Sequence, residues 1–398
     1  MSSRLLSHDL PRSRRLALAL VIVVVALLVA PFAFPGVKAL SVAAKALMFI
    51  LLVASFDLLP GYTGIVSFAH TMFFGIGAYG VAIAGTRLGP GWSEVLLGTA
   101  AALVTSLLLS LLVGLFSLRV KAIFFAMITL AVASAFQTLT SQLSNFTGGE
   151  DGLSFRTPEW LSPAFELSST PVLGLVIDGR ILAYYGLFVA VALLFLALLR
   201  IVNSPFGRVL QAIRENDVRA EALGFRTVVY PTASNVISAL FATLAGALLA
   251  LWLRYVGPDT TLSFEIMLDI LLIVVIGGMG TMYGAVVGAA LFVLAQNYLQ
   301  DLLRLASAAF EGVPLLGAAL TPDRWLLWLG LLFVLSVHHF PSGIVGRLRA
   351  AVRRCGGAAM SACSAAPRSP AQRSAAFTCA AKAASCTSPS GATHKRRH

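Results

Sequence analysis

The sequence predicts an all-α, polytopic membrane protein with about ten transmembrane helices. Two observations predict this class. Hydrophobic residues make up 58% of the 398-residue chain, and charged residues make up only 12%. A soluble globular domain carries about twice that share of charged residues. Apolar segments of about 20 residues, long enough to cross a bilayer, recur along most of the chain. The composition therefore excludes a soluble globular protein.

The first apolar segment follows a short basic N-terminus. Arg14 and Arg15 precede an apolar run, and no clear small-residue cleavage site follows it, so we interpret the run as a membrane helix rather than a signal peptide. Candidate spans cover residues 16–35, 39–59, 63–84, 95–117, 121–142, 181–202, 228–252, 264–282, 284–302 and 324–341. Three of them are less regular. The span 63–84 contains His70 and several glycines, and only a short glycine-containing break separates 264–282 from 284–302.

The distribution of Lys and Arg orients these spans. Residues 1–15 are expected to form a cytosolic N-terminus, 16–346 the transmembrane domain and 347–398 a disordered, basic, Ala/Ser-rich cytosolic tail. The arginine clusters fall in these termini and near residues 200–226, which the positive-inside rule places in the cytosol. Lys38 and Lys45 are assigned to the opposite side.

Most of the net charge of +12 comes from the tail. Residues 347–398 carry ten Lys and Arg and no Asp or Glu, which leaves 19 basic against 17 acidic residues elsewhere. Because this charge does not lie on a folded basic face, we expect no nucleic-acid partner. All four cysteines also lie in the tail, at spacings that match no metal-ligand pattern.

A polar segment, residues 203–224, separates two strongly apolar halves. A Pro205–Gly207 turn opens it, and Gly224 is placed to close it. Charged residues alternate with apolar residues that we expect to pack against the protein: Val209, Leu210, Ile213, Val218, Ala222 and Leu223. This pattern predicts one amphipathic helix of about four turns at the cytosolic surface. It fits either a solvated loop or a docking helix for a soluble partner.

Two segments interrupt the membrane-helix pattern in similar ways, with an acidic residue followed by a glycine-rich break. The first begins at Asp57 and the second at Asp269. Such paired breaks point to a translocation pathway, for which the candidate residues are Asp57, Gly61, Tyr62, Gly64, Ser67, His70, Gly277, Gly278 and Gly280. The alternative is that the glycines, including the Gly284–Gly288 pair, serve helix packing. For His70 the alternative is a hydrogen-bonded packing residue.

The longest loop on the outer side covers residues 143–180. It contains tight-turn residues that are candidates for an outer mouth: Thr147, Gly148, Gly149, Asp151 and Gly152. An ordinary surface loop is the alternative interpretation.

Motifs for catalysis are absent from the sequence. It contains no GxxxxGK[ST] nucleotide-binding loop, no HExxH and no GxSxG. We therefore expect no catalytic residue, no metal site and no cofactor bound by this chain.

Several ordered motifs resemble those of LivM-type permeases, the membrane subunits of branched-chain amino acid ABC importers. Those in the body of the chain are residues 57–70 with 73–79, the loop 147–153 and the segments 204–208, 212–216 and 221–224. Those near its end are 277–281 with Gly284 and Gly288, and 340–346. The resemblance covers about residues 40–346.

The resemblance implies a set of partners in a bacterial inner membrane. These are a LivH-like second permease, two cytosolic ATPases that carry ATP and Mg²⁺, and a periplasmic substrate-binding protein. It also implies that 203–224 is an ATPase-coupling segment, with Arg208, Arg214, Glu215, Glu221, Ala222 and Gly224 as coupling residues. The chain departs from the general importer pattern Glu-Ala-Ala-x-x-x-Gly, since Leu223 and Gly224 follow Ala222 directly.

The function that the resemblance implies is the permease subunit of an ATP-driven importer of branched-chain amino acids, which forms half of the translocation pathway and docks a separate ATPase. Urea and short amides are the alternative substrates. The first alternative is an ion-coupled secondary transporter of a small polar solute. The polar segment argues against it, since such a transporter needs no ATPase. A membrane-embedded enzyme is the third class.

Overall fold

The computed structural model of the chain describes residues 14–33, 36–117, 122–158, 161, 179–309, 324–339, 343, 345 and 346. The long helices are α1 (Arg14–Ala33), α2 (Val37–Asp57), α3 (His70–Arg87), α4 (Trp92–Ser117), α5 (Ala122–Gln142), α7 (Gly179–Val202), α10 (Val229–Leu253), α12 (Phe264–Gly277), α13 (Met282–Ala309) and α15 (Trp325–His339). Each expected span overlaps one of them. The expected N-terminus and tail lie almost entirely outside the described residues.

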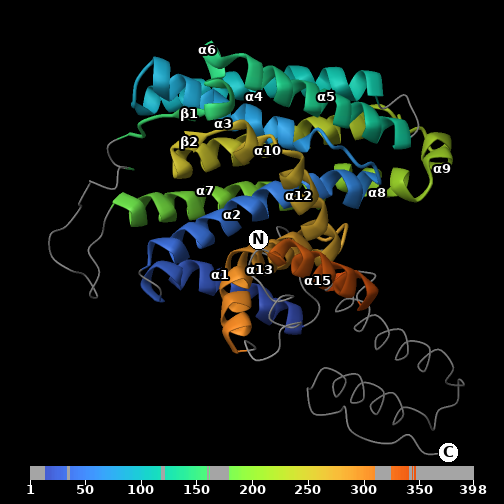
Figure 1. Cartoon of the computed structure of the whole chain (residues 1–398). Helices are drawn as coiled ribbons and strands as arrows, with labels where there is room; N and C mark the ends of the chain where they lie inside the picture. Colours follow the sequence, from blue (N-terminus) through green and yellow to red (C-terminus); the bar gives the residue numbers. More distant parts are fainter. Residues whose placement is uncertain are drawn as a thin grey trace, which may run out of the picture.

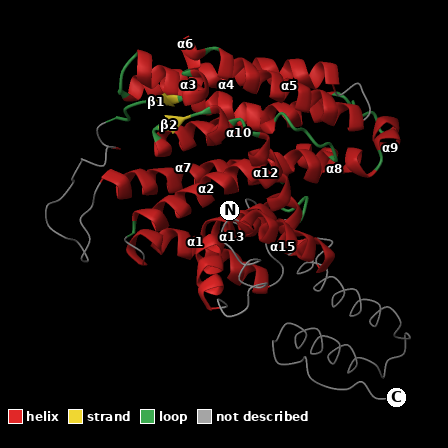
Figure 2. Cartoon of the chain, in the orientation of Figure 1, coloured by secondary structure: helices red, strands yellow, loops and turns green. Residues whose placement is uncertain are grey.

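The all-α polytopic class is confirmed. Among the described residues, seven helical segments are long and apolar enough to cross a membrane. The other three expected spans coincide with α1, α3 and α15, of which α1 has a shorter apolar stretch, Ala17–Phe32. Figure 2 shows that helices make up nearly all of the described structure, with one short pair of strands. The count of ten spans stays a prediction.

Helix α2 lies at the centre of the fold. From Val42 to Asp57 every residue except Lys45 is buried. Neighbours surround it on several sides, chiefly α13, α10, α7 and α12. The sequence favours this position, because small residues such as Ala43, Ala44 and Ala46 let other helices approach closely.

Glycines set the closest helix contacts. A Cβ at Gly77 of α3 would overlap the carbonyl oxygen of Thr243 in α10, and a Cβ at Gly246 would overlap the carbonyl oxygen of Phe74. On the other side of the molecule, a Cβ at Gly288 of α13 would lie 2.7 Å from the Ile273 carbonyl oxygen of α12. These contacts support the packing interpretation for the Gly284–Gly288 pair.

Two expected span boundaries are wrong. The span expected at 63–84 begins only at His70, because α2 continues into a π-helical turn, η2 (Leu58–Thr63), and an irregular segment follows. Pro60 lacks the amide hydrogen that a regular α-helix needs there, and Gly64, with φ of +77°, ends the turn. The span expected at 264–282 ends at Gly277, since Gly278 and Gly280 take positive φ values.

Short elements occupy the two ends of the helices (Figure 1). At one end lie α8 (Pro205–Glu215) and α9 (Asp217–Ala222). At the other end lie α6 (Ser144–Thr147), the 3₁₀ turn η3 (Gly149–Asp151), and strands β1 (Leu153–Ser154) and β2 (Tyr255–Val256). A further short helix, α11 (Pro258–Thr261), follows β2. The strands pair antiparallel, with Leu153 opposite Val256.

Candidate functional site

The polar segment 203–224 forms two short helices, so the prediction of one continuous helix was wrong. Asn216 separates α8 from α9 with an extended backbone (φ −162°). Its side-chain oxygen accepts a hydrogen bond from the Arg219 backbone N–H at 2.9 Å and caps α9. Gly224, with φ of +89°, ends α9 as expected.

Because the chain turns at Asn216, the buried face of α8 does not continue along α9. Gly207, Leu210 and Ile213 of α8 are buried. In α9 only Ala220 is buried. The expected inward packing of Val218, Ala222 and Leu223 is therefore wrong, since all three are exposed.

The exposed side of this segment combines charged and apolar side chains. All the candidate coupling residues, Arg208, Arg214, Glu215, Glu221, Ala222 and Gly224, are exposed. Next to them, Val218 is 72% exposed and Leu223 is 70% exposed. The sequence-based prediction placed these two residues on the buried face, so it did not identify them as surface residues. We call Val218, Glu221, Ala222 and Leu223 the exposed α9 face.

Arg214 connects the polar segment to the first glycine-rich break. Its guanidinium Nη1 donates a hydrogen bond to the Gly61 carbonyl oxygen in η2. Its aliphatic stem lies against Gly64, where a Cβ would be 3.1 Å from Arg214 Cγ. A larger side chain at residue 64 would therefore press on the arginine stem, and the positive φ of Gly64 also disfavours other residues.

The second glycine-rich break meets the first at the same place. The backbone N–H of Gly280 donates to both carboxylate oxygens of Asp57, at 2.9 and 3.1 Å. Arg214 is also close enough to attract the Asp57 carboxylate. Gly343, from the closing motif, packs against Gly278, where a Cβ would meet the Gly278 backbone. We call Asp57, Gly61, Arg214 and Gly280 the coupling junction.

The remaining pathway candidates lie inside the fold. His70 is buried, with its Nε2 3.0 Å from Ser55 Oγ and 3.2 Å from the Leu52 carbonyl oxygen. Its ring packs against Phe56. These contacts support the packing interpretation of His70. Tyr62 is also buried, as is Ser67, whose hydroxyl has no hydrogen-bond partner among the described residues.

The candidate outer-mouth residues lie at the opposite end of the helices from the coupling junction (Figure 1). Gly148, Gly149 and Gly152 all take positive φ values, which explains the glycines of this loop. Thr147 Oγ1 donates to the Thr140 carbonyl oxygen at 2.6 Å. The loop is tied to the second half of the chain, because the Tyr255 hydroxyl donates to the Asp151 carbonyl oxygen at 3.1 Å.

Residues 38–337 match the model of a family described as the permease component of branched-chain amino acid transport systems. The chain belongs to this family. The match covers the coupling junction, the polar segment and the outer loop. Together with the LivM relatives described next, this match confirms the sequence-based identification of a LivM-type permease.

Individual relatives of this permease carry the same description. It is 28% identical, over 70% of its own length and 68% of the relative's, to the high-affinity branched-chain amino acid transport system permease protein LivM of Escherichia coli K12. It is 27% identical to the Salmonella typhimurium protein of that name, over 69% of its own length and 68% of the relative's. A probable LivM protein of Methanocaldococcus jannaschii is 26% identical, over 58% and 61% of the two lengths. No solved structure matches the permease.

Proposed function

We propose that this permease is the LivM-type subunit of an ATP-driven importer of branched-chain amino acids in a bacterial inner membrane, with both termini in the cytosol. A LivH-like second permease supplies the other half of the pathway. Two ATPases bind ATP and Mg²⁺ on the cytosolic side, and a periplasmic protein delivers the substrate. In this proposal the chain itself performs no catalysis and binds no cofactor.

The observation that carries the proposal is the link between the exposed polar segment and the helix breaks. Arg214 extends from α8 to Gly61, and Gly61 lies directly against Asp57 and Gly280. A force applied to α8 by a partner therefore reaches the end of α2 and the α12–α13 break through direct contacts. Such a rigid connection between a docking surface and a pathway is what an ATP-driven switch requires.

The exposed α9 face supports an ATPase as the partner. Exposed Val218 and Leu223 lie beside the charged side chain of Glu221, and apolar patches with a polar rim are typical of protein interfaces. A secondary transporter has no need for such a surface.

The test is co-purification of the permease with its ATPases, second permease and binding protein after co-expression. We expect Glu221→Arg and Val218→Asp to release the ATPase while the second permease stays bound, because each change places a mismatched charge on the docking face. Glu150→Arg, an exposed change at the opposite end, is the matched control.

Two results would contradict the proposal. ATPase binding that survives both α9 changes would remove the docking role of this face. Transport down an ion gradient by the purified chain alone, with no ATPase, would favour a secondary transporter.

A further inference from the structure

Three polar side chains from three helices form a continuous bridge in the membrane-spanning part of the chain. Lys45 Nζ of α2 donates to Gln296 Oε1 of α13 at 3.0 Å. Gln296 Nε2 in turn donates to Asp269 Oδ2 of α12 at 3.3 Å. The glutamine amide thus joins a cation to an anion. We call Lys45, Gln296 and Asp269 the charged bridge. The assignment of Lys45 to the outer side was wrong, because it lies within α2.

The charged bridge lies well inside the span. Lys45 is eight residues beyond the first residue of α2, which corresponds to about 12 Å at the helical rise of about 1.5 Å per residue. Gln296 lies at a similar depth, nine residues before Leu305, where the apolar part of α13 ends. Charged groups at such depth cost several kcal/mol when they face hydrocarbon. They therefore face protein or water.

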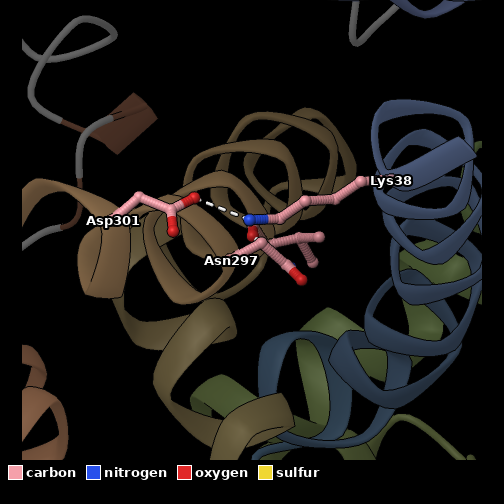
Figure 3. Close-up of polar contacts among 4 residues, drawn as sticks. Lys38, Asn297 and Asp301 are labelled. Carbon is pink, nitrogen blue, oxygen red and sulfur yellow. Dashed lines mark hydrogen bonds and ion pairs between the residues drawn. The ribbon is translucent and has the colours of Figure 1, made fainter. Parts of the chain in front are cut away.

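One side of the bridge is not covered by the rest of the described chain. Lys45, Asp269 and Gln296 are each only partly buried, and Glu265, one turn further out on α12, is exposed. Further out still, Lys38 Nζ of α2 and Asp301 Oδ2 of α13 form an ion pair at 2.6 Å. Figure 3 shows this pair with Asn297 beside it. Polar side chains thus run from the outer end of α2 and α13 down to the charged bridge.

A polar stripe that begins at the outer end and leads to a partly buried pair of opposite charges fits a water-filled path better than a lipid-facing surface. One amide oxygen and one amide nitrogen, both of Gln296, lie between the positive Lys45 and the negative Asp269. A zwitterionic amino acid carries a carboxylate oxygen and an ammonium nitrogen at a spacing comparable to that of these two amide atoms. It can satisfy both residues at once, whereas urea carries no charge and an anion or a cation matches only one residue.

We propose that the charged bridge lines the translocation pathway and contacts the head group of a zwitterionic amino acid. Lys45 binds the substrate carboxylate, Asp269 binds its ammonium, and Gln296 occupies this place between substrates. The inference rests on the proposed function, and it selects amino acids over urea and short amides.

The experiment measures uptake of radiolabelled leucine by the complete complex, purified with its partners and reconstituted in proteoliposomes. The variants are Lys45→Met, Asp269→Asn and the double variant. We expect each to lower the uptake rate about tenfold or more, because each removes a charge-assisted hydrogen bond to the substrate. The ATPase and the second permease should remain bound. Arg180→Met and Asp259→Asn are the controls. Both are exposed charged residues near the starts of α7 and α11, and neither belongs to the polar stripe or to the charged bridge. We expect both controls to leave uptake within about twofold of wild type.

The double variant separates substrate binding from a structural role. Removal of one charge leaves its partner unpaired, whereas removal of both restores neutrality inside the protein. If the bridge binds substrate, Lys45→Met with Asp269→Asn regains the thermal stability of wild type but not its uptake. If the bridge only holds helices together, the double variant regains uptake as well, which overturns the inference.

Other outcomes are equally decisive. Loss of the second permease from Lys45→Met or Asp269→Asn would show a subunit contact instead of a substrate contact. Wild-type uptake in both single variants would overturn the inference and leave the proposed function standing. A wild-type complex that binds ATPase but imports no leucine would overturn the proposed substrate and the inference together.

Discussion

Gly61 has no space for a side chain, because three parts of the chain meet around it. A Cβ at this position would overlap the Asp57 carboxylate and the Gly280 backbone N–H. Its carbonyl oxygen accepts the hydrogen bond from Arg214. The absence of a side chain here therefore lets η2, the α12–α13 break and α8 come into direct contact.

We expect Gly61→Ala to destabilise the permease by about 1–3 kcal/mol, which is the usual cost of overpacking a close contact. The melting temperature of the detergent-purified protein measures this effect. Gly186→Ala is the matched control, since a Cβ at Gly186 in α7 meets nothing within 4 Å. Alanine is also the better helix former. Equal melting temperatures for both variants would contradict the crowding at Gly61.

The stability of helix α9 depends on its N-cap residue, because the helix itself is short. It contains six residues, too few to be stable alone. The Asn216 side chain holds its first turn through the Arg219 N–H. The exposed α9 face is therefore positioned by a single polar side chain at the start of the helix.

Asn216→Ala should cost about 1 kcal/mol of helix stability, as loss of an N-cap commonly does. If α9 is the proposed docking element, its ATPase affinity falls about fivefold, the factor that corresponds to about 1 kcal/mol. Asn216→Ser keeps a capping oxygen and should retain the affinity. The measurement is the Kd of the ATPase for the permease in nanodiscs. If Asn216→Ala frays α9 but leaves the ATPase affinity unchanged, α9 is not the docking element.

The molecule as a whole has two distinct ends (Figure 1). One carries the polar segment and the coupling junction. The other carries the outer loop, which the β1–β2 pair and Tyr255 tie to the second half of the chain. Helices α2, α7 and α12 end at the coupling junction or beside it, which agrees with alternating spans that place 203–224 and residues 147–152 on opposite sides.

Cysteine labelling tests this orientation. In a variant whose four native cysteines are replaced by serine, we expect Asp151→Cys to react with an impermeant maleimide in intact spheroplasts. Val218→Cys should react only after lysis, because the positive-inside rule places it in the cytosol. Both positions are exposed, so access to solvent within the chain does not limit either reaction. Labelling of both positions in intact spheroplasts would contradict the proposed topology.

The sequence by itself was sufficient to predict the fold class, the family and several local features. Runs of about 20 apolar residues can only be accommodated by a membrane, and each predicted run overlaps a helix. The motifs around residues 57–79, 204–224 and 277–288 identified the family that the comparison confirmed. Gly224 ends α9 because a positive φ suits glycine, and this preference is visible in the sequence.

Only the tertiary structure decided which of these parts act together. An extended residue, Asn216, interrupts the helix and changes the face of α9 that is exposed, whereas a periodicity argument assumes one unbroken helix. Arg214 and Gly61 are 153 residues apart in the chain, and Asp57 and Gly280 are 223 apart. The charged bridge joins Lys45 to Gln296 across 251 residues. Hydrophobic periodicity predicts which face of each helix is apolar and which is polar. The partner that each face meets is set by the packing of all the helices at once.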